Sequence, residues 1–191
     1  MTAYSPLSAA HDPAGHLAEW ALAESGPTPG ALDTVTIRWE NEGFTVTGTL
    51  EHERVEYVMR LSSAWQLRQF ILFRDLEEPD LWLATDGHGR WGEMNGAHRT
   101  ELDGCRDLIL DGAAVSHALV IRRLPLHVGH TAELPVIVVD TDSLDVTTRL
   151  RRYTRTADRE WTVDDGEGEI RFEVDEHGLP RDLPGQSRRV R

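Results

Sequence analysis

The chain has 191 residues and a formal net charge of −13, because 33 acidic residues outnumber 20 basic ones, all of them arginine. This acidic excess argues against a nucleic-acid partner, since phosphate binding needs concentrated positive charge, and against docking on an anionic membrane. No apolar stretch approaches the ~18 residues of a membrane helix, so we expect no membrane insertion. The lone cysteine, Cys105, fits a reducing cytoplasm, where we expect the protein to work.

Residues 1–33 differ in composition from the rest, being rich in Ala, Pro, Gly and Ser. Asp12 as an N-cap and Pro13 at the first helical position predict a short helix over 11–24, with Leu17 and Trp20 on a weak apolar stripe. The sequence Gly-Pro-Thr-Pro-Gly then predicts a linker. We therefore divide the chain into an N-terminal extension, 1–33, and a single β domain, 34–191, and expect the domain to fold without residues 1–30.

After residue 33, apolar and polar residues alternate with the period of a β-strand. Strands are predicted at 34–39, 44–49, 55–61 and 66–74, and residues 81–84 pair with 90–94 in a hairpin across the turn 86–89. A bend at Gly104 and then a short strand are predicted within 102–110, and further strands at 115–126, 135–139, 146–153, 160–163 and 169–174. About ten short strands joined by hairpin turns indicate a mainly β domain, folded as a barrel, half-barrel or sandwich.

Sequence patterns of catalytic or metal-binding sites are absent. His127 and His130 are the closest pair of histidines, and in a strand their odd spacing would point them to opposite faces. The serines lack the Gly-x-Ser-x-Gly context of a nucleophile elbow, and no glycine-rich loop opens a helix to bind phosphate. We predict no catalytic residue, no metal and no cofactor.

Tryptophan is the feature of the sequence that indicates a ligand. Six Trp residues occur, five of them in or beside predicted strands, and a Trp ring can line an apolar pocket while its N–H finds a polar partner. For any single Trp, a place in the core is the more common outcome. The candidate ligand-binding side chains are Trp39, Tyr57, Trp65, Trp82, Trp91, Arg122, Arg123 and Tyr153.

Arg122 and Arg123 are candidates because of where the predicted strand 115–126 would place them. Adjacent strand residues face opposite sides, so one of the two arginines would lie among aliphatic side chains. A buried guanidinium needs a partner. That partner is either an internal carboxylate, such as Asp103 or Asp107, or a ligand head group held bidentately.

Several short blocks, in the same order along the chain, resemble a bacterial family known as glycolipid-binding, formerly a domain of unknown function. The resemblance runs over residues 35–190, and its most specific blocks are Ile37-Arg38-Trp39, Ala64-Trp65, Arg90-Trp91 with Asn95-Gly96, 102–108, Ile121-Arg122-Arg123-Leu124, Arg152-Tyr153 and 172–185. It implies a curved antiparallel sheet forming a barrel or half-barrel with an apolar cavity, similar to the lipoprotein-carrier fold. The chain departs from the family pattern at 113–117, at Leu183, and in residues 1–33, which have no counterpart there.

The resemblance and the Trp-rich strands together imply that a glycolipid, a fatty acyl chain or another amphiphile binds in an apolar, β-lined cavity. Two alternatives stay open. The domain is a small hydrolase or isomerase of an apolar substrate, with Arg122 or Arg123 and a histidine such as His127 in the pocket. Otherwise it is a structural or interaction domain whose concavity is filled by its own side chains.

Overall fold

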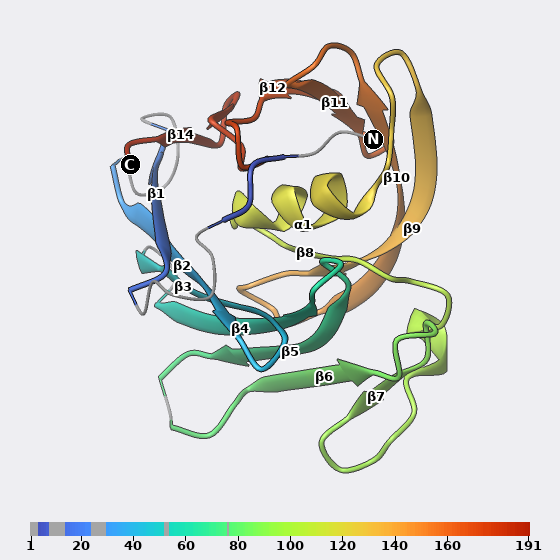
Figure 1. The fold of residues 1–191 in the computed structure, drawn as a ribbon. Coiled ribbons are helices and arrows are strands. Elements are labelled where there is room, and N and C mark those ends of the chain that lie inside the picture. The colour runs from blue at the N-terminus through green and yellow to red at the C-terminus, as the bar shows by residue number, and fades with distance from the viewer. Residues whose placement is uncertain (1–3, 8–13, 24–29, 52–53, 76) are drawn as a thin grey trace.

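The computed structural model describes residues 4–7, 14–23, 30–51, 54–75 and 77–191. Its strands form two sheets that curve around one helix, α1, as Figure 1 shows. This confirms the predicted fold class, a mainly β half-barrel. Among the described residues, no helix has the length and hydropathy of a transmembrane span.

Sheet A is antiparallel and has nine strands in the order β13-β14-β1-β2-β3-β4-β5-β6-β7. From β1 to β7 each strand pairs with the next one along the chain, and the C-terminal hairpin of β13 and β14 joins beside β1. The bounds are β1 (His16–Leu22), β2 (Leu32–Glu40), β3 (Gly43–Leu50), β4 (Val55–Ser62), β5 (Leu67–Phe73), β6 (Leu81–Thr85), β7 (Trp91–Glu93), β13 (Asp182–Leu183) and β14 (Ser187–Arg189).

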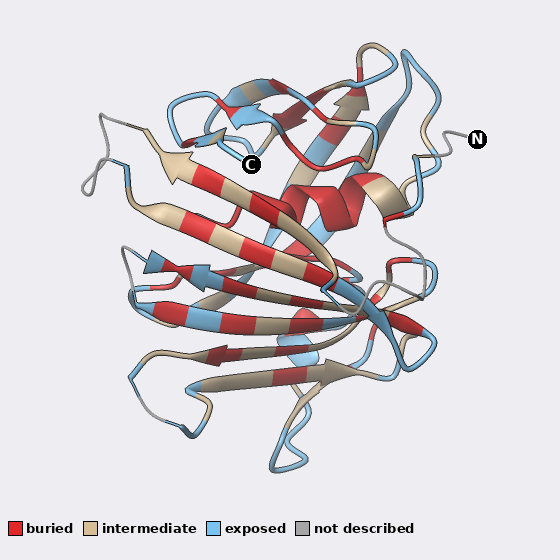
Figure 2. Cartoon of the chain, turned by 60° about the vertical axis from the view of Figure 1, so that its left-hand side comes forward, coloured by how far each residue is buried: buried red, intermediate tan, exposed pale blue. Residues whose placement is uncertain are grey.

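Alternation of apolar and polar residues builds this sheet as the sequence predicts. In β4, Val55, Tyr57, Met59 and Leu61 are buried while the residues between them are more exposed, and the same banding runs along the neighbouring strands in Figure 2. The Tyr57 ring lies across the backbone of β3 at Gly48, where an added Cβ would come within 2.2 Å of the ring. Only glycine leaves room for the ring there.

The helix expected over 11–24 is wrong, because residues His16–Leu22 form strand β1 between β2 and β14. Ala18 and Trp20 are fully buried and alternate with less buried neighbours, the period of a strand. The proposed helix start, Asp12 and Pro13, and most of the linker lie outside the described residues. The division of the chain at residue 33 stays a prediction, which truncation can test.

Sheet B has five strands in the order β12-β11-β10-β9-β8. Strands β9 to β12 are antiparallel, and β8 runs parallel to β9. The bounds are β8 (Leu108–Leu110), β9 (Thr131–Val139), β10 (Val146–Arg155), β11 (Glu160–Asp164) and β12 (Glu169–Glu173). The sheet curls around the side of α1 that sheet A does not cover (Figure 1).

The strand expected over 115–126 is also wrong, because Val115–Arg123 form the helix α1. All residues from Val115 to Ile121 are buried, including the polar Ser116 and His117, so the sequence of this segment does not show which face is solvated. Figures 1 and 2 place this buried helix between the two sheets. The concavity that we expected to be an apolar cavity is therefore occupied by α1.

Hydrogen bonds to both sheets hold the N-terminal end of α1. The Asp33 carboxylate of β2, only 1% exposed, accepts the backbone N–H of Ala114 at 3.3 Å. Ser116 accepts the backbone N–H of Leu110, at the end of β8, through its hydroxyl oxygen at 3.0 Å. Polar contacts in an apolar interior fix the register of the helix, because leaving any of these groups unpaired would be costly.

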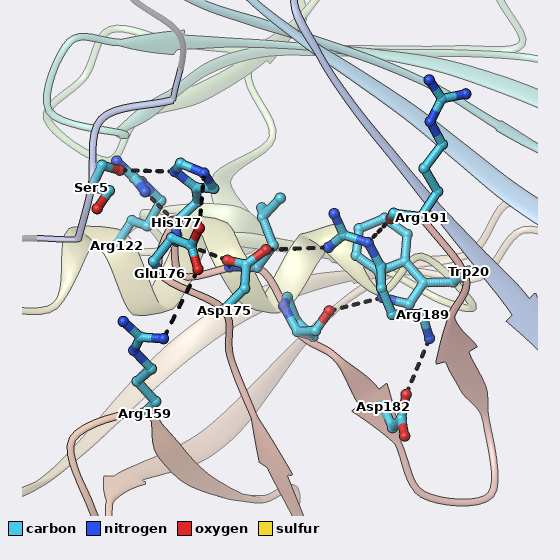
Figure 3. Close-up of polar contacts among 12 residues, drawn as sticks. Ser5, Trp20, Arg122, Arg159, Asp175, Glu176, His177, Asp182, Arg189 and Arg191 are labelled. Carbon is cyan, nitrogen blue, oxygen red and sulfur yellow. Dashed lines mark hydrogen bonds and ion pairs between the residues drawn. The ribbon is translucent and has the colours of Figure 1, made fainter.

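The turn 175–180 fastens the other end of α1 to the edges of both sheets (Figure 3). Asp175 accepts two backbone N–H groups of its own turn and lies 3.5 Å from the Arg189 guanidinium of β14. Arg189 in turn lies over the Trp20 ring, whose N–H donates to the carbonyl of Pro180 at 2.9 Å. Arg122 donates from the last turn of α1 to the carbonyl of His177.

Candidate functional site

A cleft of about 370 Å³ opens at the edge of sheet A, on the β6–β7 hairpin and the turn that follows it. We call it the Trp82 cleft; its lining residues are Trp82, Ala84, Thr85, Asp86, Arg90, Trp91, Gly92, Glu93, Gly96, Ala97 and His98. In β6, Leu83 is buried in the core, so its neighbours Trp82 and Ala84 face the opposite side of the sheet. Trp82 thus presents a large half-buried ring to the cleft.

The hairpin that carries the cleft is the one predicted from sequence, with Ala84 opposite Gly92. Its turn is held by Asp86, whose Oδ1 accepts the backbone N–H groups of His88 at 2.7 Å and Arg90 at 3.2 Å. These N–H groups, first that of His88, lower the pKa of the Asp86 carboxyl. Asp86 is therefore ionised at neutral pH and fixed at the rim of the cleft.

A second turn brings His98 back against β7, where it forms a bridge with Gly92. The His98 Nε2 lies 2.9 Å from both oxygens of Asp103, and this contact is the main cause of the lowered pKa of Asp103. On its other side, the His98 Nδ1 lies 3.4 Å from the Arg90 Nη2. The three side chains form a chain from Asp103 through the imidazole to the Arg90 guanidinium.

The remaining carboxylate of the cleft is already paired. Glu93 accepts from the Arg99 guanidinium at 2.7 Å, and Arg99 also donates to Glu101. These contacts, first that with Glu101, raise the pKa of Arg99. Glu93 is thus less available to a ligand than Asp86.

Two of the eight predicted ligand residues, Trp82 and Trp91, lie together in the Trp82 cleft. Trp91 contributes mainly to its wall, since its side chain is 1% exposed and its N–H donates to the carbonyl of Cys105 at 2.9 Å. Cys105 itself is buried, as expected for a small apolar side chain.

Trp39, Trp65 and Arg122 meet in a separate aromatic cluster. Trp39 packs edge-on against Phe44 at 4.8 Å between ring centroids, and Phe44 packs against Trp65 at 4.7 Å. The Arg122 guanidinium lies 4.1 Å from the centre of the Trp65 ring and 5.8 Å from that of Tyr4. Burial lowers the pKa of Arg122 to about 10, which leaves it charged at neutral pH.

Arg123 has the internal partner that the sequence allowed. Its Nε donates to Asp107 at 2.8 Å, and its Nη2 donates to the second oxygen of the same carboxylate. Asp107 is 2% exposed, so the pair is largely buried. Asp103, the other carboxylate considered, pairs with His98 instead.

Tyr57 and Tyr153 lie in the core, each beside one buried polar group. Burial raises the pKa of Tyr57, and the neighbouring Asp33 raises it further. Neither Tyr57 Oη nor Asp33 Oδ1 completes a hydrogen bond of standard geometry. Burial raises the pKa of Asp33 to about 7. Tyr153 lies 3.0 Å from the Nδ1 of His117, whose pKa burial lowers to about 3, so this imidazole is neutral.

Sequence reasoning missed Arg90, His98 and Asp103 as a group. Arg90 and Asp103 do fall in blocks that carried the family resemblance, but their spacing matches no known motif. Two tight turns, at 86–89 and 94–97, bring the three side chains together. The signal that could have found them is the strong hairpin pattern, which places residue 90 just before the strand that pairs with the one carrying Trp82.

The fold and the cleft together define a class of small β half-barrel domains with an internal helix and an aromatic-floored polar cleft at one sheet edge. Within this class the chain belongs to the family described as "Putative glycolipid-binding", whose sequence pattern matches residues 26–189. A crystal structure of a DUF1089 family protein from Pseudomonas aeruginosa is similar, with 26% sequence identity and a TM-score of 0.73, over 88% of this chain and 97% of that one. The comparison with curated proteins finds no match.

Proposed function

We propose that the protein binds a glycolipid or another amphiphile, and that the sugar of this ligand occupies the Trp82 cleft. The observation that carries the proposal is that the half-buried Trp82 ring lines the same cleft as Asp86 and Arg90. A sugar ring has a face of C–H groups that can stack on an aromatic ring, and hydroxyls that can donate to a carboxylate and accept from a guanidinium. The membership of a family described as glycolipid-binding supports this choice of ligand.

The size of the cleft agrees with a small head group. At about 370 Å³ it lies at the lower end of the range typical of ligand pockets. The acyl chain that our sequence analysis placed inside the half-barrel would have to displace α1. Binding through the head group requires no such movement.

Calorimetric titration with octyl glucoside, below its critical micelle concentration, tests the proposal. Covering one face of the Trp82 ring removes about 80 Å² of apolar surface from water, worth roughly 2 kcal/mol or about 30-fold in affinity. We expect Trp82→Ala to lose that much. Trp39→Ala is the matched control, because Trp39 is 37% exposed and does not line the cleft. Loss of binding with Trp39→Ala but not with Trp82→Ala would move the site to the aromatic cluster.

A second candidate function, hydrolysis or isomerisation of a small apolar substrate, draws support from His98, which lines the cleft and pairs with Asp103 behind it. Both ring nitrogens of His98 already have partners, Asp103 and Arg90, so the ring directs no free lone pair at the cleft. We therefore favour binding. A turnover of p-nitrophenyl esters that disappears in a His98→Phe variant would establish the catalytic alternative.

A further inference from the structure

The Arg90 guanidinium lacks the kind of carboxylate partner that Arg99 and Arg123 have. Arg99 has two carboxylate partners, and Arg123 holds Asp107 with two nitrogens. In the part of the chain that the structure describes, no carboxylate lies within ion-pair distance of Arg90. Its one side-chain partner is the imidazole of His98.

The donor and acceptor roles of Asp103, His98 and Arg90 follow from their chemistry. Ionised Asp103 can only accept, so the Nε2 of His98 carries a proton and donates to it. Arg90 can only donate, so the Nδ1 of a neutral His98 accepts from it. Asp103 Oδ1 also accepts the backbone N–H of Trp91 at 3.3 Å, which ties these three side chains to β7. Arg90 is thus held in place through His98 rather than by a direct ion pair with Asp103.

Asp86 and Asp103 interact with Arg90 electrostatically, but among the described residues neither lies close enough to form an ion pair with it. Glu93 is paired with Arg99, and one oxygen of Asp86 is occupied by two backbone N–H groups of its own turn. A planar guanidinium with free N–H groups matches a carboxylate, phosphate or sulfate group, each of which can accept two parallel hydrogen bonds.

We propose that the Trp82 cleft takes a sugar that carries an acidic group, and that Arg90, positioned by His98 and Asp103, binds that group. This inference rests on the proposed function, since it assumes that the sugar stacks on Trp82. It adds the class of sugar, an anionic one, and a role for each of the three polar side chains. Arg90 contacts the ligand, and His98 and Asp103 are positioning residues.

Calorimetric titration of the full chain with three soluble probes tests the inference: methyl glucoside, methyl glucuronide and glucose 6-phosphate. We expect the wild type to bind at least one acidic probe tenfold or more tightly than methyl glucoside, because charge-assisted bidentate hydrogen bonds are among the strong ones. The comparison of the two acidic probes tells a carboxylate from a phosphate source. The preference should shrink in 0.5 M salt, which screens an exposed charge.

Arg90→Gln should abolish the preference, because it should weaken binding of the preferred acidic probe at least tenfold more than binding of methyl glucoside. Arg90→Lys should keep part of the preference for the acidic probe, since lysine keeps the positive charge but lacks the planar guanidinium. His98→Leu should lower the ratio of the affinity for the acidic probe to that for methyl glucoside. A merely structural role of His98 would instead lower both affinities together. Arg106→Gln, at an exposed arginine outside the cleft, is the matched control.

The outcomes separate the two proposals. Equal binding of neutral and acidic probes, or a preference that survives in Arg90→Gln, overturns the acidic-sugar inference while sugar binding stands. If no probe binds and octyl glucoside binding is insensitive to Trp82→Ala, the proposed function fails, and the acidic-sugar inference fails with it.

Discussion

The buried pair of Arg123 and Asp107 gives the most direct test of how α1 is held between the sheets. Replacing Arg123 by Met leaves a carboxylate that is 2% exposed without its guanidinium. Removing one partner of a buried pair costs about 3–5 kcal/mol, and the 17% exposure of the Arg123 side chain places this case near the lower end. We therefore expect Arg123→Met to lower the free energy of unfolding by about 3 kcal/mol.

Urea denaturation followed by tryptophan fluorescence measures the loss, as a midpoint lower by about 1–2 M at an unchanged slope. Adding Asp107→Asn removes the stranded charge and should recover most of the loss. The matched control is Arg152→Met, because Arg152 pairs with Glu133 at 2.9 Å but both side chains are about half exposed. That pair should contribute less than about 1 kcal/mol. If Arg123→Met costs no more than Arg152→Met, the buried pair is not what anchors the helix.

Three further predictions follow from the fold. Removing residues 1–23 deletes β1 from within sheet A and should abolish cooperative unfolding, with Trp20→Ala alone costing about 3–5 kcal/mol; a truncated chain with a wild-type urea midpoint would restore the sequence-based view of this segment as an appendage. Gly48→Ala sets a methyl group against the Tyr57 ring and should cost about 1–3 kcal/mol in urea denaturation, and adding Tyr57→Leu should relieve it. The pKa of Asp33 in the folded state, about 7, exceeds its unfolded value near 4, so the stability that its protonated form provides is lost as pH rises from about 4 to 7. Wild-type stability measured relative to Asp33→Asn should fall by up to roughly 4 kcal/mol over this window, and a difference that does not vary with pH would show that Asp33 is ionised throughout.

Sequence alone predicted those elements in which one face is buried and the other solvated. The β6–β7 hairpin carries both an alternating pattern and glycines in its turn, and it forms as expected. Helix α1 has no solvent-exposed face from Val115 to Ile121, because both sheets cover it, so its period could not be read from the sequence. The β1 segment fits two periods equally well: Leu17 and Trp20 have helical spacing, and Ala18 and Trp20 have strand spacing. Pairing with β14 makes it a strand.

The candidate site was predictable only in part, for a related reason. Trp82 could be identified because its place in a strand follows from local alternation. Arg90, His98 and Asp103 are joined by hydrogen bonds whose geometry depends on two turns and on a bridge to Gly92. Local patterns predict which face a residue occupies, but they do not predict which side chains from different turns come within reach of one another.

Because β1 pairs with β14, sheet A cannot be completed until the ribosome has synthesised the C-terminal hairpin. The Trp20 N–H and its acceptor, the carbonyl of Pro180, are separated by 160 residues of chain. At a synthesis rate of about 5–20 residues per second, that separation corresponds to roughly 8–32 s of translation. During this interval β1 has no neighbour on its outer edge, and an unpaired edge can pair with another nascent chain. Slow codons or a chaperone that acts before the C-terminal hairpin emerges would therefore change the yield of folded protein more than its final stability.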